Sequence, residues 1–158
     1  MTEAPVRHWL GKVSIDEGSL APASPEQEHE RKVAVVDLIK SNVFEPQGGN
    51  GGPYVLTLAT VEGRLQLDIT GPGFAQRHQL SMSPFRRIIR DYFMVCDSYY
   101  DAIKNATTNQ IEALDMGRRG LHNEGSSLLQ RRLAGKVDID LDTARRLFTL
   151  ICALQWRG

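Results

Sequence analysis

Several features of common functional classes are scarce in this chain of 158 residues. It has two cysteines, Cys96 and Cys152, without CxxC spacing or a nearby histidine, so neither a zinc site nor dithiol redox chemistry is indicated. No stretch approaches the roughly 20 apolar residues that span a bilayer. Residues 1–10 have no apolar run long enough for a signal peptide. We therefore expect a cytoplasmic protein with no membrane segment.

Recognisable catalytic and metal-binding patterns are also lacking. No serine or cysteine stands in a nucleophile motif, and the histidines are scattered: His8, His29, His78 and His122. The glycine-rich segment 45–53 lacks the Lys-Ser/Thr that a phosphate-binding loop carries into a helix, so a flexible connection is the better interpretation. We expect no metal and no cofactor.

Neither sign of charge is in excess. Lys+Arg and Asp+Glu each number 19, which gives no indication of a nucleic-acid partner. Residues 116–158 differ, because they hold 8 Lys/Arg and 4 Asp/Glu and carry a net charge of +4. This segment can face a small anion, but solvated arginines on helix surfaces are the better interpretation. RNA binding would need aromatic residues among the arginines, and only Phe148 and Trp156 are present.

The length and patterning predict a single α+β domain over residues 1–158, with a flexible tail at 1–8 and a glycine-rich loop at 45–53. We expect an antiparallel sheet of three to four strands, with about four helices packed on one face. The clearest strand signal is a hairpin, in which 54–61 and 64–70 flank the turn Glu62-Gly63. Weaker alternation favours further strands at 9–15 and 74–82.

Capping signals predict where the helices begin. Ser24 with Gln27 and Thr107 with Gln110 form capping boxes, Ser83-Pro84 resembles another helix start, and Asp140 or Asp142 can cap the last helix. We expect the first helix to bury Val33, Val36, Leu38 and Ile39. The last helix is apolar nearly all round from Leu147, which favours burial on several sides or contact with another subunit. We expect a homodimer through Leu147, Leu150, Ile151 and Leu154.

The candidate site lies within Met116–Gly125. If residues 108–134 form one helix, Arg118 falls within an apolar stripe and His122 lies on its edge. A charge in such a stripe needs a partner or a ligand, and Asp115 lies three residues before it. Alternatively, Gly117 and Gly120 break the helix and expose backbone N–H groups to an anion.

Three roles for this segment stay open. It can be structural, with close helix packing at the glycines and internal ion pairs. It can bind a small anion such as phosphate or a nucleotide through Arg118, Arg119, His122, Asn123 and Glu124. It can also be an enzyme site that uses His122 and Glu124 as acid and base, although residues two apart on a helix point to different sides.

Three strings, Pro84–Phe93, Met116–Gly125 and Asp142–Ile151, resemble a bacterial family of uncharacterised proteins, one of the UPF series. The likeness runs from about Ile15 to Leu154. The resemblance implies a bacterial cytoplasmic protein and brings no activity, cofactor or catalytic residue with it. Taken with the apolar last helix, the sequence favours a non-enzymatic interaction or regulatory protein.

Overall fold

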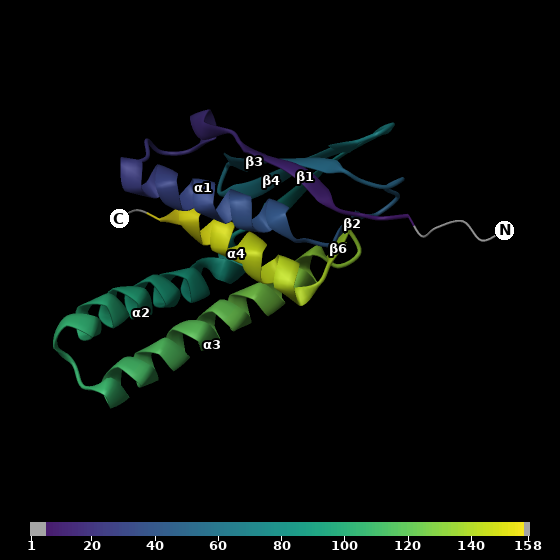
Figure 1. Cartoon of the computed structure of the whole chain (residues 1–158). Coiled ribbons are helices and arrows are strands. Elements are labelled where there is room, and N and C mark those ends of the chain that lie inside the picture. Colours follow the sequence, from purple (N-terminus) through teal and green to yellow (C-terminus); the bar gives the residue numbers. More distant parts are fainter. Residues whose placement is uncertain (1–5, 157–158) are drawn as a thin grey trace.

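The computed structural model describes residues 6–156, and these form an α+β domain with four helices and six strands (Figure 1). The predicted fold class is therefore confirmed. One sheet has the order β1-β3-β4-β5 and a second pairs β2 with β6. The strands are β1 Leu10–Ile15, β2 Phe44–Pro46, β3 Tyr54–Val61, β4 Arg64–Gly71, β5 Phe74–Ser81 and β6 Val137–Ile139. The helices are α1 Pro25–Lys40, α2 Arg86–Asn105, α3 Thr108–Leu133 and α4 Leu141–Gln155.

The predicted hairpin is present in the predicted register. Val61 pairs with Arg64, and the chain reverses at Glu62 (φ 52°) and Gly63 (φ 75°). Two successive residues with positive φ are the signature of a type I′ turn, whose twist matches that of the strands. The leucines and isoleucine that alternate along β3 and β4 are almost completely buried, so one face of this hairpin forms part of the hydrophobic core.

The sheet is antiparallel except at one edge. β1 runs parallel to β3, and the chain reaches β3 only after passing through α1 and β2. A parallel neighbour requires such a crossover, because a short turn can join only antiparallel strands. The β2–β6 pair was not predicted, since three-residue strands carry no usable periodicity.

Helix α1 begins as predicted but buries a different face. Ser24 Oγ accepts from Gln27 N–H at 3.1 Å, and Gln27 Oε1 accepts from Ser24 N–H at 2.9 Å. The helix docks through the row Gln27, Arg31, Ala34 and Leu38, which all lie within its buried face. The predicted burial of Val33 and Val36 is therefore wrong, and these side chains are 43% and 63% exposed.

Helices α2 and α3 form a long antiparallel hairpin that projects away from the sheet (Figure 1). The Thr107–Gln110 capping box starts α3, and the helix continues without a break through Gly117 and Gly120. The alternative of a kink that exposes free N–H groups is thus wrong. Ser83 does not cap α2, because a short 3-10 turn, Ser83–Phe85, precedes that helix.

Helix α4 lies between α1 and the α2–α3 hairpin, which explains why it is apolar nearly all round (Figure 1). Asp140 caps it by accepting from Thr143 N–H at 2.9 Å. Leu147, Leu150, Ile151 and Leu154 are at most 6% exposed within this one chain. Burial within the core of one chain therefore accounts for the apolar character of these four side chains. The homodimer expected through them stays a prediction.

Two segments expected to be loose are partly ordered. Residues 1–5 of the predicted tail lie outside the described residues, but Arg7 C=O accepts from Gly52 N–H at 2.9 Å, and His8 Nδ1 lies 2.7 Å from the Tyr54 hydroxyl. The loop predicted at 45–53 begins at 47, because Phe44–Pro46 pairs as a strand with β6. Within residues 6–156, no helix is both long and apolar enough to cross a membrane.

Candidate functional site

The five residues predicted as a site on α3 make their polar contacts with several different partners. Arg118 Nη2 lies 2.6 Å from Asp115 Oδ1, and Arg119 Nη2 lies 2.9 Å from Asp115 Oδ2. The Arg118 guanidinium also stacks over the Tyr99 ring, 4.4 Å from its centroid. The charge within the apolar stripe is thus compensated by a carboxylate one turn away and by an aromatic face.

His122 is enclosed by helices α2 and α4. Its ring centroid lies 5.6 Å from that of Tyr92 and 5.3 Å from that of Phe148. Its Nε2 lies 2.7 Å from Thr149 Oγ1, and that hydroxyl already donates to the Arg145 carbonyl at 3.0 Å. Nε2 must therefore be the protonated nitrogen, since the hydroxyl has only acceptor capacity left for it.

The surroundings of His122 favour its neutral form. Burial, and then the positive charges of Arg145 and Arg118, lower its pKa below the ordinary value. Ser126 Oγ donates to the His122 carbonyl at 2.7 Å and lies 3.4 Å from Nδ1. His122 thus acts as a neutral hydrogen-bonding group that joins α3 to α4.

Asn123 and Glu124 have other partners. Asn123 Oδ1 accepts from Arg145 Nε at 3.1 Å, whereas Glu124 pairs with Arg87 of α2 at 3.5 Å. The proposed acid/base pair is therefore divided between separate polar partners: His122 Nε2 contacts Thr149 of α4, and Glu124 pairs with Arg87 of α2.

The glycines of this segment divide into two kinds. A Cβ added to Gly125 would lie 2.2 Å from Phe148 Cζ, so only glycine leaves room for the ring. At Gly117 the nearest atom is 3.8 Å away, and at Gly120 nothing lies within 4 Å. Gly125 is therefore a packing residue, and the other two are not needed for the approach of the helices.

A small hollow lies beside the cluster formed by Arg118, His122 and their partners. It has a volume of about 220 Å³ and is lined by Tyr92, Arg118, Arg119, His122 and Asn123. Four of the five predicted residues therefore do share one surface, and Glu124 does not. Among residues 6–156 there is no group of three or more His, Cys, Asp or Glu side chains placed to hold a metal ion.

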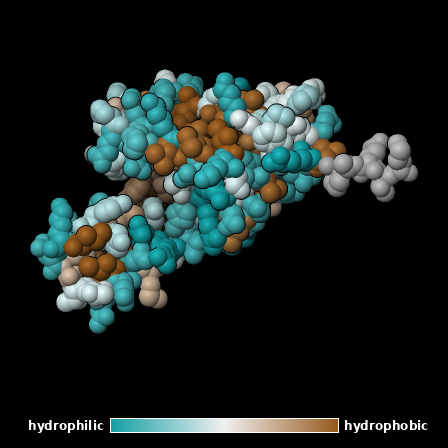
Figure 2. Space-filling model, viewed as in Figure 1, coloured by the Kyte–Doolittle hydropathy of each residue, from teal (hydrophilic) through white to brown (hydrophobic). Residues whose placement is uncertain are grey.

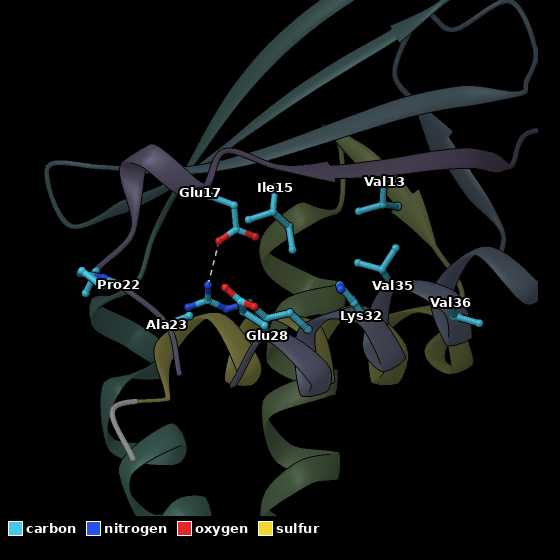
Figure 3. Close-up of a pocket in the computed structure, with 11 residues that line it drawn as sticks. Val13, Ile15, Glu17, Pro22, Ala23, Glu28, Lys32, Val35 and Val36 are labelled. Carbon is cyan, nitrogen blue, oxygen red and sulfur yellow. Dashed lines mark hydrogen bonds and ion pairs between the residues drawn. The ribbon is translucent and has the colours of Figure 1, made fainter. Parts of the chain in front are cut away.

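A larger groove of about 830 Å³ lies between β1 and α1 (Figure 3). Val13 and Ile15 project from β1 toward the helix, and Val35 projects from α1 toward the strand. Figure 2 shows a continuous apolar area over these two elements. The lining residues are Val13, Ile15, Glu17, Ala21, Pro22, Ala23, Glu28, Arg31, Lys32, Val35 and Val36.

The strand that borders this groove has an unpaired edge. β1 is the last strand of its sheet in the part of the chain that the structure describes. Asp16 N–H donates to the Leu58 carbonyl of β3 at 2.8 Å, and successive residues of a strand present their backbone groups to opposite edges. Val13 and Ile15 therefore direct their N–H and C=O groups away from β3, along the groove.

Side chains of α1 and its C-cap region hold both ends of β1. At one end, Asn42 Oδ1 accepts from Leu10 N–H at 2.7 Å, and Asn42 Nδ2 donates to the Leu10 carbonyl at 3.2 Å. At the other end, Arg31 Nη1 pairs with Glu17 Oε2 at 2.9 Å, as the dashed line in Figure 3 marks. The open edge lies between these two contacts.

Arg31 is the most unusual side chain of the groove. It is 4% exposed, and its Nε is a buried polar atom without a hydrogen-bond partner among the described residues. Sequence reasoning missed this region, because an arginine on a helix is ordinarily a surface residue. One signal was available: α1 has more apolar positions, including Val33, Val35 and Val36, than a single buried face requires.

Comparison with known proteins places these residues in a family context. The model of the uncharacterised protein family UPF0262 matches residues 7–157. A UPF0262 protein of Phenylobacterium zucineum (strain HLK1) is 62% identical, over 99% of this chain and 98% of its own length. UPF0262 proteins of Caulobacter vibrioides (strain NA1000 / CB15N) and Rhizobium meliloti (strain 1021) are 61% and 55% identical, over 99% and 94% of this chain and 99% and 95% of their own lengths. No solved structure matches.

Proposed function

We propose that this chain, which belongs to the uncharacterised protein family UPF0262, is a non-enzymatic interaction protein that binds an extended polypeptide segment in the groove between β1 and α1. The observation that carries this proposal is the unpaired edge of β1 beside an apolar groove. His122 contacts Thr149 and Glu124 pairs with Arg87, which supports a structural role for both side chains.

The chemistry of a strand edge specifies a polypeptide as the occupant. Val13 and Ile15 each present one donor and one acceptor, spaced as in a sheet, and an extended chain satisfies all of them at once. The part of β1 beyond the Asn42–Leu10 contact, residues 11–15, extends over about 17 Å, which accommodates a segment of similar length.

The groove would supply the specificity. Alternate side chains of an added strand would point toward α1, where Val35 and Val36 meet Val13 and Ile15. Val36 is 63% exposed, so covering it with an apolar partner side chain removes apolar surface from water. Main-chain bonds and apolar contacts would thus act together.

Amide hydrogen exchange can test, without a bound partner, whether the edge of β1 is unpaired. We expect the Val13 and Ile15 amides to exchange much faster than those of Ser14 and Asp16, which face β3. Equal protection of all four amides would show that the edge is already covered and would overturn the proposal.

Binding itself can be tested by selecting displayed random heptapeptides on the protein. We expect enriched peptides to alternate apolar residues and to slow exchange at Val13 and Ile15. Val36→Asp should weaken binding, whereas Val33→Asp should not, because Val33 lies on the same helix outside the groove lining. A selection that enriches nothing, or peptides equally affected by both variants, would contradict the proposal.

A second candidate function is the binding of a small anion in the 220 Å³ hollow. It is favoured by the two arginines, Arg118 and Arg119, that line this hollow together with the amide of Asn123. Titration with inorganic phosphate should shift the Arg119 and Asn123 amide resonances. Arg119→Gln should abolish the shifts and Arg87→Gln should not, and unchanged spectra would leave the cluster with a structural role only.

A further inference from the structure

We infer that the groove binds a segment through its free carboxyl terminus, with Arg31 as the residue that pairs with the carboxylate. This inference rests on the proposed function and names the chemistry that the groove recognises. It is drawn from the environment of Arg31, from the exposure of Glu17, and from the shape of the groove at that end.

Arg31 is a buried cation with spare hydrogen-bonding capacity. Its side chain is 5% exposed. Among residues 6–156, its Nη1 pairs with Glu17 Oε2, and its Nε has no hydrogen-bond partner. A guanidinium can bind a carboxylate with two parallel N–H···O bonds, and an incompletely paired buried charge is costly. Arg31 can therefore bind a further carboxylate beside that of Glu17, or a carboxylate that replaces Glu17 and makes two hydrogen bonds.

The present partner of Arg31 is a carboxylate that can leave. Glu17 comes from the short turn after β1, and its side chain is 61% exposed, so water can solvate it when it is displaced. Ion pairs with such an exposed member contribute little stability. Glu17 thus occupies the position that the carboxylate of a bound segment would take.

The other charges at this end do not provide an alternative cation of the same kind. Lys32 and Glu28 also line the groove, but both side chains are exposed and their charges sum to zero, which leaves Arg31 as the buried cation at this end. When Glu17 moves out, the site carries one positive charge in excess, and a single carboxylate balances it.

The shape of the groove favours a chain end over an acidic side chain. Ala21, Pro22 and Ala23 lie between the turn after β1 and α1 and line the groove. Figure 3 shows Pro22 and Ala23 at the end of the groove where Glu17, the partner of Arg31, lies. An added strand cannot continue straight past this connection and would end there. A segment that runs parallel to β1 places its carboxyl terminus at Arg31, because Glu17 and Arg31 lie at the C-terminal end of β1.

The test uses heptapeptides displayed with free carboxyl termini, followed by synthesis of an enriched peptide in acid and amide forms. We expect the acid form to bind about tenfold or more tightly than the amide form. Arg31→Gln should remove this difference. Glu17→Gln should strengthen binding of the acid form about two- to fivefold and leave the amide form unchanged, because it removes the competing charge but keeps an acceptor for Nη1.

The outcomes separate this inference from the proposed function. Equal binding of the acid and amide forms in the groove would overturn the role of Arg31 and leave strand addition intact. Absence of binding by both forms would overturn the proposed function itself. Amide spectra of each variant show whether it is folded, and if Arg31→Gln is not, the Glu17→Gln result with the acid and amide forms decides the question alone.

Discussion

The cluster around Arg118 and the groove at Arg31 both place an arginine against apolar surroundings, but they satisfy it differently. Arg118 has a carboxylate one turn away on its own helix and an aromatic ring beneath it. Arg31 pairs with an exposed carboxylate from another element, and its Nε has no hydrogen-bond partner in the described part of the chain. The first arrangement is complete in itself, whereas the second is open to an added ligand.

This difference shows that an unusual sequence motif need not mark a binding site. Within Met116–Gly125, helix packing explains Gly125, and internal pairs explain the charged residues. Packing does not explain Gly117 and Gly120. The groove has ordinary-looking residues, and its potential arises from an unpaired strand edge. The predictions below test whether the cluster is structural, as this comparison requires, beginning with the largest expected effect.

Gly125→Ala should cause the largest loss of stability. The added methyl group would overlap the Phe148 ring, whose atoms lie 2.2 to 2.6 Å from the Cβ position, and overpacking of a core typically costs about 1–3 kcal/mol. We expect a loss of about 3 kcal/mol in urea unfolding, because the backbone of α3 would have to move. A loss below about 0.5 kcal/mol would mean that Phe148 has free space, and the structural account of this segment would fail.

Asp115→Asn should have the next largest effect. It removes the charge that Arg118 and Arg119 share, and Arg118 is only 28% exposed, so we expect a loss of about 1–2 kcal/mol. Arg119→Gln is the matched control, because Arg119 is 75% exposed and should change stability by less than about 0.5 kcal/mol. Equal effects of the two variants would indicate that Arg118 does not need its partner.

Gly120→Ala should stabilise the protein by about 1 kcal/mol. The added Cβ meets nothing within 4 Å, and alanine is favoured over glycine in a helix interior by about that amount. Thermal unfolding checks the sign against Gly125→Ala, which lies on the same helix. A loss of stability would show that Gly120 is required for a reason that the packing of α3 does not provide.

The sequence predicted most of the fold because its signals are local. The Glu62-Gly63 turn, the capping boxes at Ser24 and Thr107 and the alternation of β3 and β4 depend on neighbouring residues. The face of α1 was predicted wrongly, because valine at two positions suggested burial while Arg31, a charged residue, in fact faces the core. Burial there depends on α4 and β1, which are distant in sequence.

The candidate site was predicted in part for a similar reason. The pairing of Arg118 with Asp115 was foreseeable, since residues three apart share a helix face. The contacts of His122 with Thr149 and of Glu124 with Arg87 join different helices and were not foreseeable. The β1 edge is a property of strand order, which periodicity does not contain.

The smallest expected effect is a change in how stability depends on pH. The pKa of His122 is lowered in the folded chain, so below its ordinary value of 6.5 the unfolded chain binds more protons than the folded one. The contribution of His122 to stability is therefore present above pH 6.5 and is lost as the pH falls through its folded pKa. His122→Gln should make stability less dependent on pH between 7.5 and about 5, since the amide can still donate to Thr149. The pKa of His78 is also lowered, mainly by its partial burial, so His78→Gln provides the matched comparison for urea unfolding at each pH. If the dependence of stability on pH is the same in His122→Gln as in the unmodified chain, the surroundings of His122 do not keep it neutral. The hollow beside Arg118 would then again be a candidate for anion binding through a protonated His122.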